Sequence, residues 1–211
     1  MRLYLSSYGL GNKPEELAYL IGTNKHVAVI MNAGDLDGEY RKISLEKQIS
    51  SLKALGLEPE EIDLRKYFGK SEDLKTTLSK FGAVWIRGGN AFMLQRAVEQ
   101  SGFNKVIVEM LKNDKIVYAG YSAGVIIATP TLKGIELIDH LSEIPAGYKA
   151  DFSWNGMNLV SYSIAPHYQS DHQESQAVEK LVQYFEEKKM PYKKLRDGEV
   201  IVVEGDKERI I

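Results

Sequence analysis

Apolar and polar positions form two kinds of pattern along the first part of the chain. Short, mostly apolar runs such as HVAVIMNAG, residues 26–34, are typical of buried parallel strands. The longer segments between these runs place apolar residues three or four positions apart, which indicates amphipathic helices. The pattern predicts strands at 1–7, 26–34, 58–64, 83–90 and 115–121, and helices at 12–22, 39–56, 71–82, 91–102, 103–114 and from residue 122 onward.

This alternation of strand and helix predicts an α/β fold with a doubly wound, mostly parallel sheet of the flavodoxin-like type. Two glycine turns, Gly88-Gly89 and Gly120–Gly124, directly follow predicted strands. Both turns therefore belong at the carboxyl edge of the sheet, which is where such folds bind their ligands.

The pattern is weaker after Ala128, and the segment that follows it looks irregular as far as residue 161. No linker, repeat or low-complexity segment divides the chain, so we expect one domain, residues 1–211. The last part of the chain predicts a strand that begins at residue 158 and ends at His167, a helix at 170–189 capped by Ser170 or Asp171, and a C-terminal hairpin at 193–211 with turns at Asp197-Gly198 and Gly205-Asp206.

The amino-acid composition of the chain excludes several kinds of function. The 211 residues carry a formal net charge of −2, which gives no reason to expect nucleic acid or an anionic membrane as a partner. The chain has no cysteine, which excludes disulfides, thiolate catalysis and cysteine-ligated zinc. No stretch is long and apolar enough to span a membrane, and we expect a cytoplasmic protein.

The stretch YAGYSAGVII, residues 118–127, contains a Gly-x-Ser-x-Gly motif centred on Ser122. A serine on a tight strand-to-helix turn exposes its Oγ, and the flanking Gly120 and Gly124 remove side chains that would clash across the turn. The N–H groups at the start of the following helix favour developing negative charge. Ser122 is therefore the candidate nucleophile. The alternative is a serine that only caps an ordinary helix.

A serine nucleophile needs a general base, and the chain has four histidines. His167 follows an apolar strand in IAPHYQSDH, so it can reach the same edge of the sheet as Ser122, and His172 is the second candidate. A hydrogen-bonded structural histidine is the alternative for His167. No His-Glu-x-x-His or His-x-x-Glu-His spacing is present, so the sequence predicts no metal site.

The acid that orients the base is less well determined. The α/β-hydrolase order places it between the serine and the histidine, where Asp139 and Asp151 are candidates. Another order places it after the histidine, where Asp197 occupies a turn in LRDGEV. Because Asp-Gly turns are also common for purely structural reasons, the residues alone leave this choice open.

Four segments together resemble a known family. WIRGGNAFMLQ, YAGYSAG, APHY and LRDGEV occur in the order and approximate spacing of the S51 peptidases, which include aspartyl dipeptidase (peptidase E) and, more distantly, cyanophycinase. The resemblance implies a serine-type peptidase that acts on short peptides without a metal or organic cofactor. It also implies a catalytic triad of Ser122, His167 and Asp197, with the oxyanion held by the N–H groups of Gly89 and Ala123.

The resemblance further implies residues that contact the substrate. Asn90 lies beside the oxyanion turn, and Asp139 is the candidate for binding the substrate's α-amino group. Aspartyl dipeptidases hold an acidic side chain with an arginine on the helix after the catalytic histidine, whereas this chain has Gln176 at the matching position. Arg87 is a candidate to supply the positive charge that Gln176 lacks. The expected preference for peptides with an N-terminal aspartate depends on Arg87.

The serine turn is also compatible with functions other than a peptidase. Esterases and amidases share the serine turn, although the order Ser122, His167, Asp197 argues against them. A non-catalytic protein that binds a small molecule or a partner on the same scaffold is the alternative from another class. A class I amidotransferase is excluded because it needs a cysteine, and no G-x-G-x-x-G supports a Rossmann dinucleotide site. The sequence does not choose between a monomer and a homodimer.

Overall fold

The computed structural model describes residues 1–211, and its main sheet has seven strands in the order β3-β2-β4-β5-β1-β8-β9. The strands from β3 to β1 run parallel, while β8 is antiparallel to β1 and β9 is antiparallel to β8. The predicted α/β class, mostly parallel sheet and C-terminal hairpin are confirmed. The strands are β1 Arg2–Ser6, β2 His26–Ile30, β3 Glu58–Glu61, β4 Ala83–Ile86, β5 Val117–Tyr121, β8 Val200–Glu204 and β9 Lys207–Ile210.

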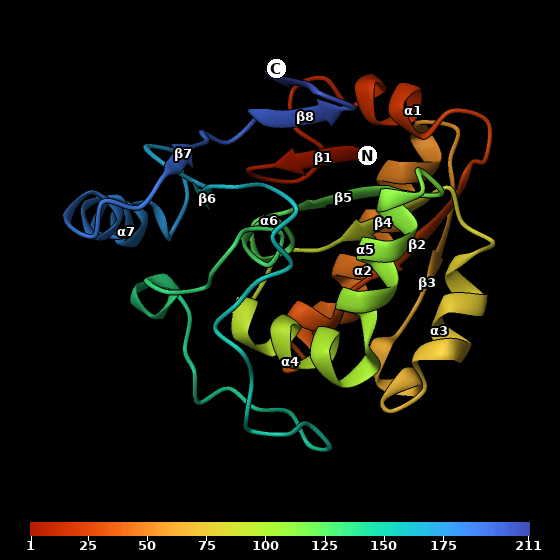
Figure 1. Cartoon of the computed structure of the whole chain (residues 1–211), viewed down its shortest axis with the longest axis horizontal. Helices are drawn as coiled ribbons and strands as arrows, with labels where there is room; N and C mark the ends of the chain where they lie inside the picture. Colours follow the sequence, from red (N-terminus) through yellow and green to blue (C-terminus); the bar gives the residue numbers. More distant parts are fainter.

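Helices cover both faces of this sheet (Figure 1). Side chains alternate along a strand, so Leu3 and Leu5 of β1 join the core cluster under α3, α4, α5, α6 and α7, whereas Tyr4 joins the cluster under α1 and α2. The helices are α1 Glu15–Ile21, α2 Glu39–Ala54, α3 Ser71–Leu78, α4 Ala91–Ser101, α5 Phe103–Lys112, α6 Ala123–Ile126 and α7 Ser175–Glu187.

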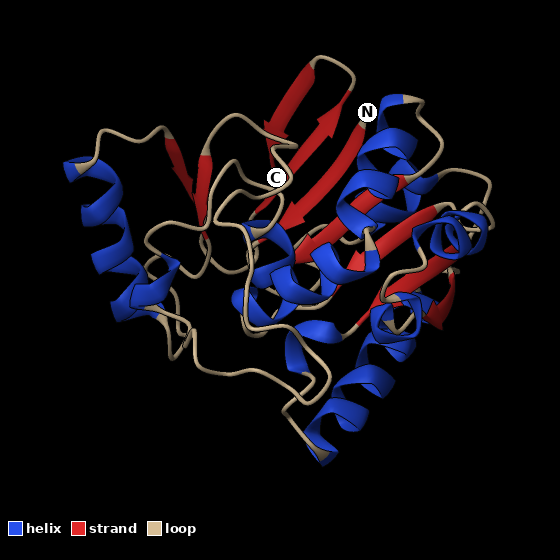
Figure 2. Cartoon of the chain, turned by 60° about the horizontal axis from the view of Figure 1, so that its bottom comes forward, coloured by secondary structure: helices blue, strands red, loops and turns tan.

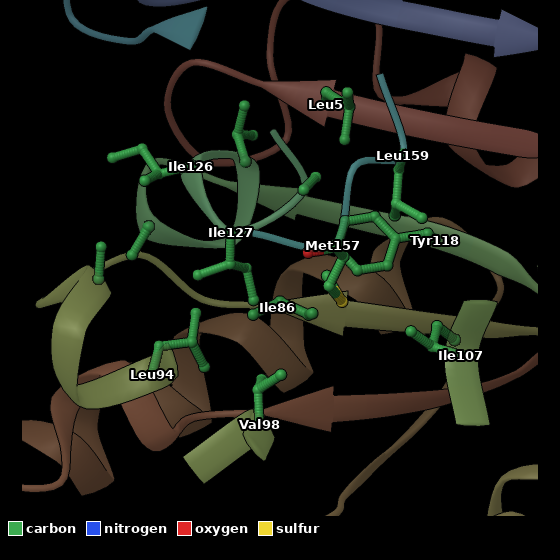
Figure 3. Close-up of a cluster of buried hydrophobic side chains, with 14 of the residues drawn as sticks. Leu5, Ile86, Leu94, Val98, Ile107, Tyr118, Ile126, Ile127, Met157 and Leu159 are labelled. Atoms are coloured by element: carbon green, nitrogen blue, oxygen red, sulfur yellow. The ribbon is translucent and has the colours of Figure 1, made fainter. Parts of the chain in front are cut away.

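The larger core cluster fixes the serine turn against the sheet. Figure 3 shows Ile86 of β4 and Tyr118 of β5 among side chains of α4, α5 and α6, including Ile107 and Ile126. All of these side chains are buried. Tyr118 is fully buried, and its hydroxyl donates a hydrogen bond of 2.5 Å to the backbone oxygen of Gly124. The core therefore holds the start of α6 in place on the strand that precedes it.

The predicted strand from residue 158 to His167 is much shorter in the structure. The strand is only β6, Ser163–Ala165, and it pairs in parallel with β7, Tyr192–Lys194, in a separate two-stranded sheet. Figure 2 shows this short pair set apart from the main sheet, on the side where α7 lies. Helix α7 begins at Ser175 rather than at residue 170, because Ser170 Oγ accepts a hydrogen bond from the Asp197 N–H instead of capping a helix.

The long segment between α6 and β6 is irregular apart from one short turn of helix, as predicted. Arg96, which is buried in α4, holds it by donating to the backbone oxygens of Leu141 and Ala150, each at 3.0 Å. Further along, the rings of Phe152 and Trp154 pack against each other at a tilt of 53° with centroids 5.2 Å apart, and both lie against Phe92 of α4. None of the helices combines the length and apolarity needed to cross a bilayer.

Candidate active site

Three parallel strands end together at one edge of the main sheet. β1 leads into Ser7, β4 into Arg87 and β5 into Ser122, and the pairing of these strands brings their carboxyl ends into line. Because β8 is antiparallel to β1, the chain that enters β8, including Asp197, arrives at the same edge. The topology thus collects residues from four distant parts of the sequence.

Ser122 occupies the sharp turn between β5 and α6. Its backbone angles are φ 50° and ψ −113°, a region that residues other than glycine rarely adopt. The turn passes close to β4, since a Cβ on either Gly120 or Gly124 would lie 2.7 Å from the backbone oxygen of Ile86. The Ser122 side chain makes no capping hydrogen bond to α6, so the geometry does not support the alternative of a simple helix cap.

The turn at Gly88-Gly89 packs against the serine turn. A Cβ on Gly88 would lie 2.9 Å from the Cβ of Ser122, and Gly89 has a φ of 136° that other residues avoid. The backbone N–H groups of Gly89 and Ala123 donate to no acceptor within the protein. These two donors are therefore available to an oxygen atom bound beside Ser122.

The small sheet of β6 and β7 brings His167 and Asp197 together. Ala165 of β6 lies opposite Lys194 of β7, so the residues two and three positions further along emerge side by side. The distance from His167 Nδ1 to Asp197 Oδ1 is 2.7 Å. A carboxylate only accepts hydrogen bonds, so Nδ1 carries the proton and the lone pair of the neutral imidazole is on Nε2.

Ser7, which the sequence pattern did not single out, ties this pair to the main sheet. Its Oγ donates to Asp197 Oδ1 at 2.9 Å and accepts from the backbone N–H of His167 at 2.8 Å. Ser7 is fully buried. Neither Asp139 nor Asp151 contacts His167, so the geometry selects Asp197 as its partner. The sequence offered one signal for this role, because Ser7 is a polar residue at the carboxyl end of the first predicted strand.

Ser122 and His167 line one cavity at this edge, with a volume of ≈ 230 Å³. Both side chains are largely buried, with exposed fractions of 8% and 1%. The side-chain hydrogen bond of His167 goes to Asp197 and none goes to Ser122; such contacts often tighten only when a substrate binds. The other lining residues are Tyr8, Tyr40, Ile43, Ser44, Lys47, Gln48, Arg87, Gly88, Gly89, Tyr121, His172 and Glu174.

Arg87 is the one predicted substrate-binding residue that lines this cavity. Its Nη1 donates to Asp37 Oδ2 at 2.7 Å, and its guanidinium lies over the Tyr40 ring with 5.8 Å between Cζ and the ring centroid. Gln176 is exposed on α7 and does not line the cavity, so the expectation that it meets the substrate is not supported.

Asn90 and Asp139 hold the start of α4 instead of facing the cavity. Asn90 Oδ1 accepts from the N–H groups of Phe92 and Met93 at 2.9 and 3.0 Å, and Asp139 Oδ2 accepts from the Ala91 N–H at 2.7 Å. Burial raises the pKa of Asp139 to about 7. These contacts give both side chains a structural role, and neither lines the cavity. Binding of substrate by either residue stays a prediction.

One wall of the cavity was missed by the sequence analysis. It is a face of α2, on which Tyr40, Ile43, Ser44, Lys47 and Gln48 recur at the spacing of one side of a helix. Tyr40 and Ile43 are large apolar residues that are 62% and 61% exposed. The signal in the sequence was that Tyr40 and Ile43 are large apolar residues on the same face of α2 as Lys47. Exposed apolar residues of this kind can mark a binding surface.

Burial lowers the pKa of His167, although the nearby charge of Asp197 acts in the opposite direction. Burial also raises the pKa of Glu174, which lines the same cavity.

We expect the reactivity of Ser122 toward a fluorophosphonate, a reagent that modifies nucleophilic serines, to depend on neutral His167. Because burial disfavours the imidazolium, the neutral form persists to lower pH than usual. The labelling rate should rise with pH through a midpoint below about 6.5, the ordinary histidine pKa, and then level off. A midpoint at or above that value would contradict the assignment.

The chain is similar to known proteins of one family. The model of Peptidase family S51 matches residues 12–211. Peptidase E of Streptomyces coelicolor is 31% identical over 135 residues, which cover 62% of this chain and 52% of that protein. A Drosophila melanogaster protein named "Probable alpha-aspartyl dipeptidase" is 28% identical over 140 residues, covering 64% and 55%. The chain thus spans about half the length of the curated relatives it matches.

A solved structure matches over a longer range. The crystal structure of a "Putative Peptidase E Protein" from Listeria monocytogenes EGD-e has a TM-score of 0.80 and 24% sequence identity, covering 100% of this chain and 97% of that chain. At this identity the likeness establishes the fold alone.

Proposed function

Because the chain belongs to peptidase family S51, we propose that it is a serine-type peptidase with Ser122 as nucleophile, His167 as base and Asp197 as triad acid. The observation that carries this proposal is that Ser122 and His167 line one cavity while Asp197 is hydrogen-bonded to His167. The strained turn of Ser122 and the buried ring of His167 line the same wall, and Asp197 holds the far nitrogen of that ring. The cavity is small, which favours short peptides over folded chains.

In the proposed reaction, His167 Nε2 takes the proton of Ser122 Oγ as that oxygen attacks a peptide carbonyl. The N–H groups of Gly89 and Ala123 stabilise the oxyanion, and loss of one such donor costs about 3–4 kcal/mol in comparable hydrolases. The imidazolium then protonates the leaving amine as the C–N bond breaks. A water molecule, deprotonated by His167, attacks the acyl-enzyme and releases Ser122.

Positive charge on the cavity wall supports acidic substrates. Arg87 and Lys47 line the cavity. Arg87 is paired with Asp37, whereas Lys47 makes no ion pair within the chain. We therefore place short peptides with an N-terminal aspartate among the substrates, with Arg87 and Lys47 taking the part of the arginine that position 176 lacks.

A hydrolysis screen tests the proposed function. Wild type and Ser122→Ala are incubated with dipeptides and tripeptides that begin with Asp, Glu or a neutral residue, and products are followed by mass spectrometry. We expect cleavage that depends on Ser122, with Asp-X peptides cleaved best. If wild type cleaves no member of the panel, the binding protein becomes the better account. Equal cleavage by both proteins would remove Ser122 from the mechanism.

Neutralising the cavity cations should lower selectivity for acidic peptides. A hydrogen bond to a charged group contributes about 1.5–3 kcal/mol, so Arg87→Met or Lys47→Gln should reduce kcat/KM for Asp-X by about tenfold or more relative to neutral dipeptides. Lys42→Gln is the matched control, because Lys42 is on the same helix but pairs with Glu39 and does not line the cavity. Selectivity that is unchanged in both Arg87→Met and Lys47→Gln would exclude these cations as its source.

A further inference from the structure

Two histidines and a glutamate converge on the wall of the same cavity. The ligand atoms that His167, His172 and Glu174 offer lie within 4.8 Å of one another, and all three residues line the cavity. Imidazole nitrogens and carboxylate oxygens are common zinc ligands, and two histidines with one glutamate form a known set. We propose that these residues bind Zn²⁺ and that the bound ion inhibits the enzyme by occupying its base.

His167 is already oriented as a metal ligand. Its Nδ1–H donates to Asp197, which leaves Nε2 as the free ligand atom, and Glu174 Oε2 lies 4.0 Å from this nitrogen. Histidines that bind metals usually donate their other N–H to a carboxylate in this way. The hydrogen bond that prepares His167 as a base therefore also prepares it to bind a cation.

His172 has to turn before it can join the site. Its ring is stacked on that of His167, with 3.7 Å between centroids and 6° between planes. A metal ion lies in the plane of each imidazole that binds it, so two parallel stacked rings cannot share one ion. His172 is half-buried, and the one hydrogen bond of its ring is from the Glu174 N–H to Nδ1 at 3.2 Å. A change of rotamer gives up this bond, the stacking on His167 and the edge contact with the Tyr8 ring.

Glu174 supplies the charge that favours a cation. It is half-buried, and no lysine or arginine pairs with it. Ligand atoms in a tetrahedral zinc site are roughly 3.3–3.5 Å apart, given bond lengths of about 2.0–2.2 Å. The three side chains therefore need to approach by about an ångström as His172 turns, and a fourth position remains open toward the cavity.

Zinc binding and proton transfer exclude each other at His167. An Nε2 lone pair that is donated to Zn²⁺ cannot accept the proton of Ser122, so the ion blocks the first step without any redox change. Removal of the ion by a chelator restores the base. This inhibition rests on the proposed function, whereas the binding of Zn²⁺ does not.

Isothermal titration of the full chain, stripped with a chelator, with ZnCl₂ tests the site. We expect one Zn²⁺ per chain, bound about tenfold or more weakly by His172→Ala and by Glu174→Gln. His140→Ala is the matched control, because His140 is exposed and does not line the cavity. Co²⁺ should give the visible absorption of a tetrahedral site in wild type and lose it in both variants. Equal Zn²⁺ affinity in wild type and both variants would overturn the proposal.

A second arm separates binding from inhibition. Zn²⁺ should slow fluorophosphonate labelling of Ser122 in wild type, a chelator should reverse the effect, and His172→Ala should need about tenfold more Zn²⁺. If the metal-free protein is not labelled at all, the proposed peptidase mechanism fails while the titration still decides the metal site. If Zn²⁺ binds with the expected variant pattern but leaves labelling unchanged, the inhibitory role is wrong.

Discussion

Replacing Ser122 by alanine should reduce kcat/KM by about 10⁵–10⁶-fold while the protein stays folded. Alanine keeps the Cβ that the strained turn already accommodates, and the Ser122 hydroxyl makes no capping bond that its loss would break. The change therefore removes the attacking oxygen and little else. Turnover and the melting temperature of purified Ser122→Ala and wild type are the quantities to compare.

Ser50→Ala serves as the control for this variant. Ser50 is exposed on α2 and does not line the cavity, so both turnover and melting temperature should match those of wild type. A Ser122→Ala protein that melts like wild type and retains more than about one per cent of its activity would contradict the assignment of the nucleophile.

Replacing His167 should be nearly as damaging, with a loss of about 10⁴–10⁶-fold. Members of a triad act as a unit, so the Ser122→Ala/His167→Ala double variant should be no slower than the worse single variant. His167→Ala also leaves a buried space beside Asp197, so His167→Gln provides a second variant that fills the site but cannot act as a base at neutral pH. Single-variant losses that multiply in the double variant would show that the two residues act independently.

The acid can be identified by a matched pair of variants. Asp197→Asn should lower kcat by about 10⁴-fold, because an amide no longer selects the tautomer with the lone pair on Nε2. Asp139→Asn should lack this effect, because Asp139 contacts the Ala91 N–H at the start of α4 rather than His167. A large loss of kcat in Asp139→Asn with little loss in Asp197→Asn would reverse the assignment.

The first part of the fold could be predicted from the sequence because each element there carries its own signal. Strands β2, β4 and β5 are nearly continuous apolar runs that the sheet buries on both faces. The two glycine turns directly follow strands. Their glycines lack a Cβ, which allows the backbone of neighbouring segments to approach closely. Placement of the serine turn at the carboxyl edge followed from these two features.

The second part was harder because its geometry comes from long-range contacts. β6 and β7 have three residues each, too few for a periodic pattern, yet their pairing brings His167 to Asp197. No local signal shows that Ser170 bonds the Asp197 N–H and leaves α7 to begin later. Likewise, only the fold shows that Asn90 and Asp139 hold the start of α4.

The most direct test of the central claim is to locate the reactive residue by mass spectrometry after treatment with a fluorophosphonate. We expect one adduct per chain on the peptide that contains Ser122, no adduct in Ser122→Ala, and much slower labelling in His167→Gln. An adduct on another residue, or equal labelling of wild type and Ser122→Ala, would contradict it.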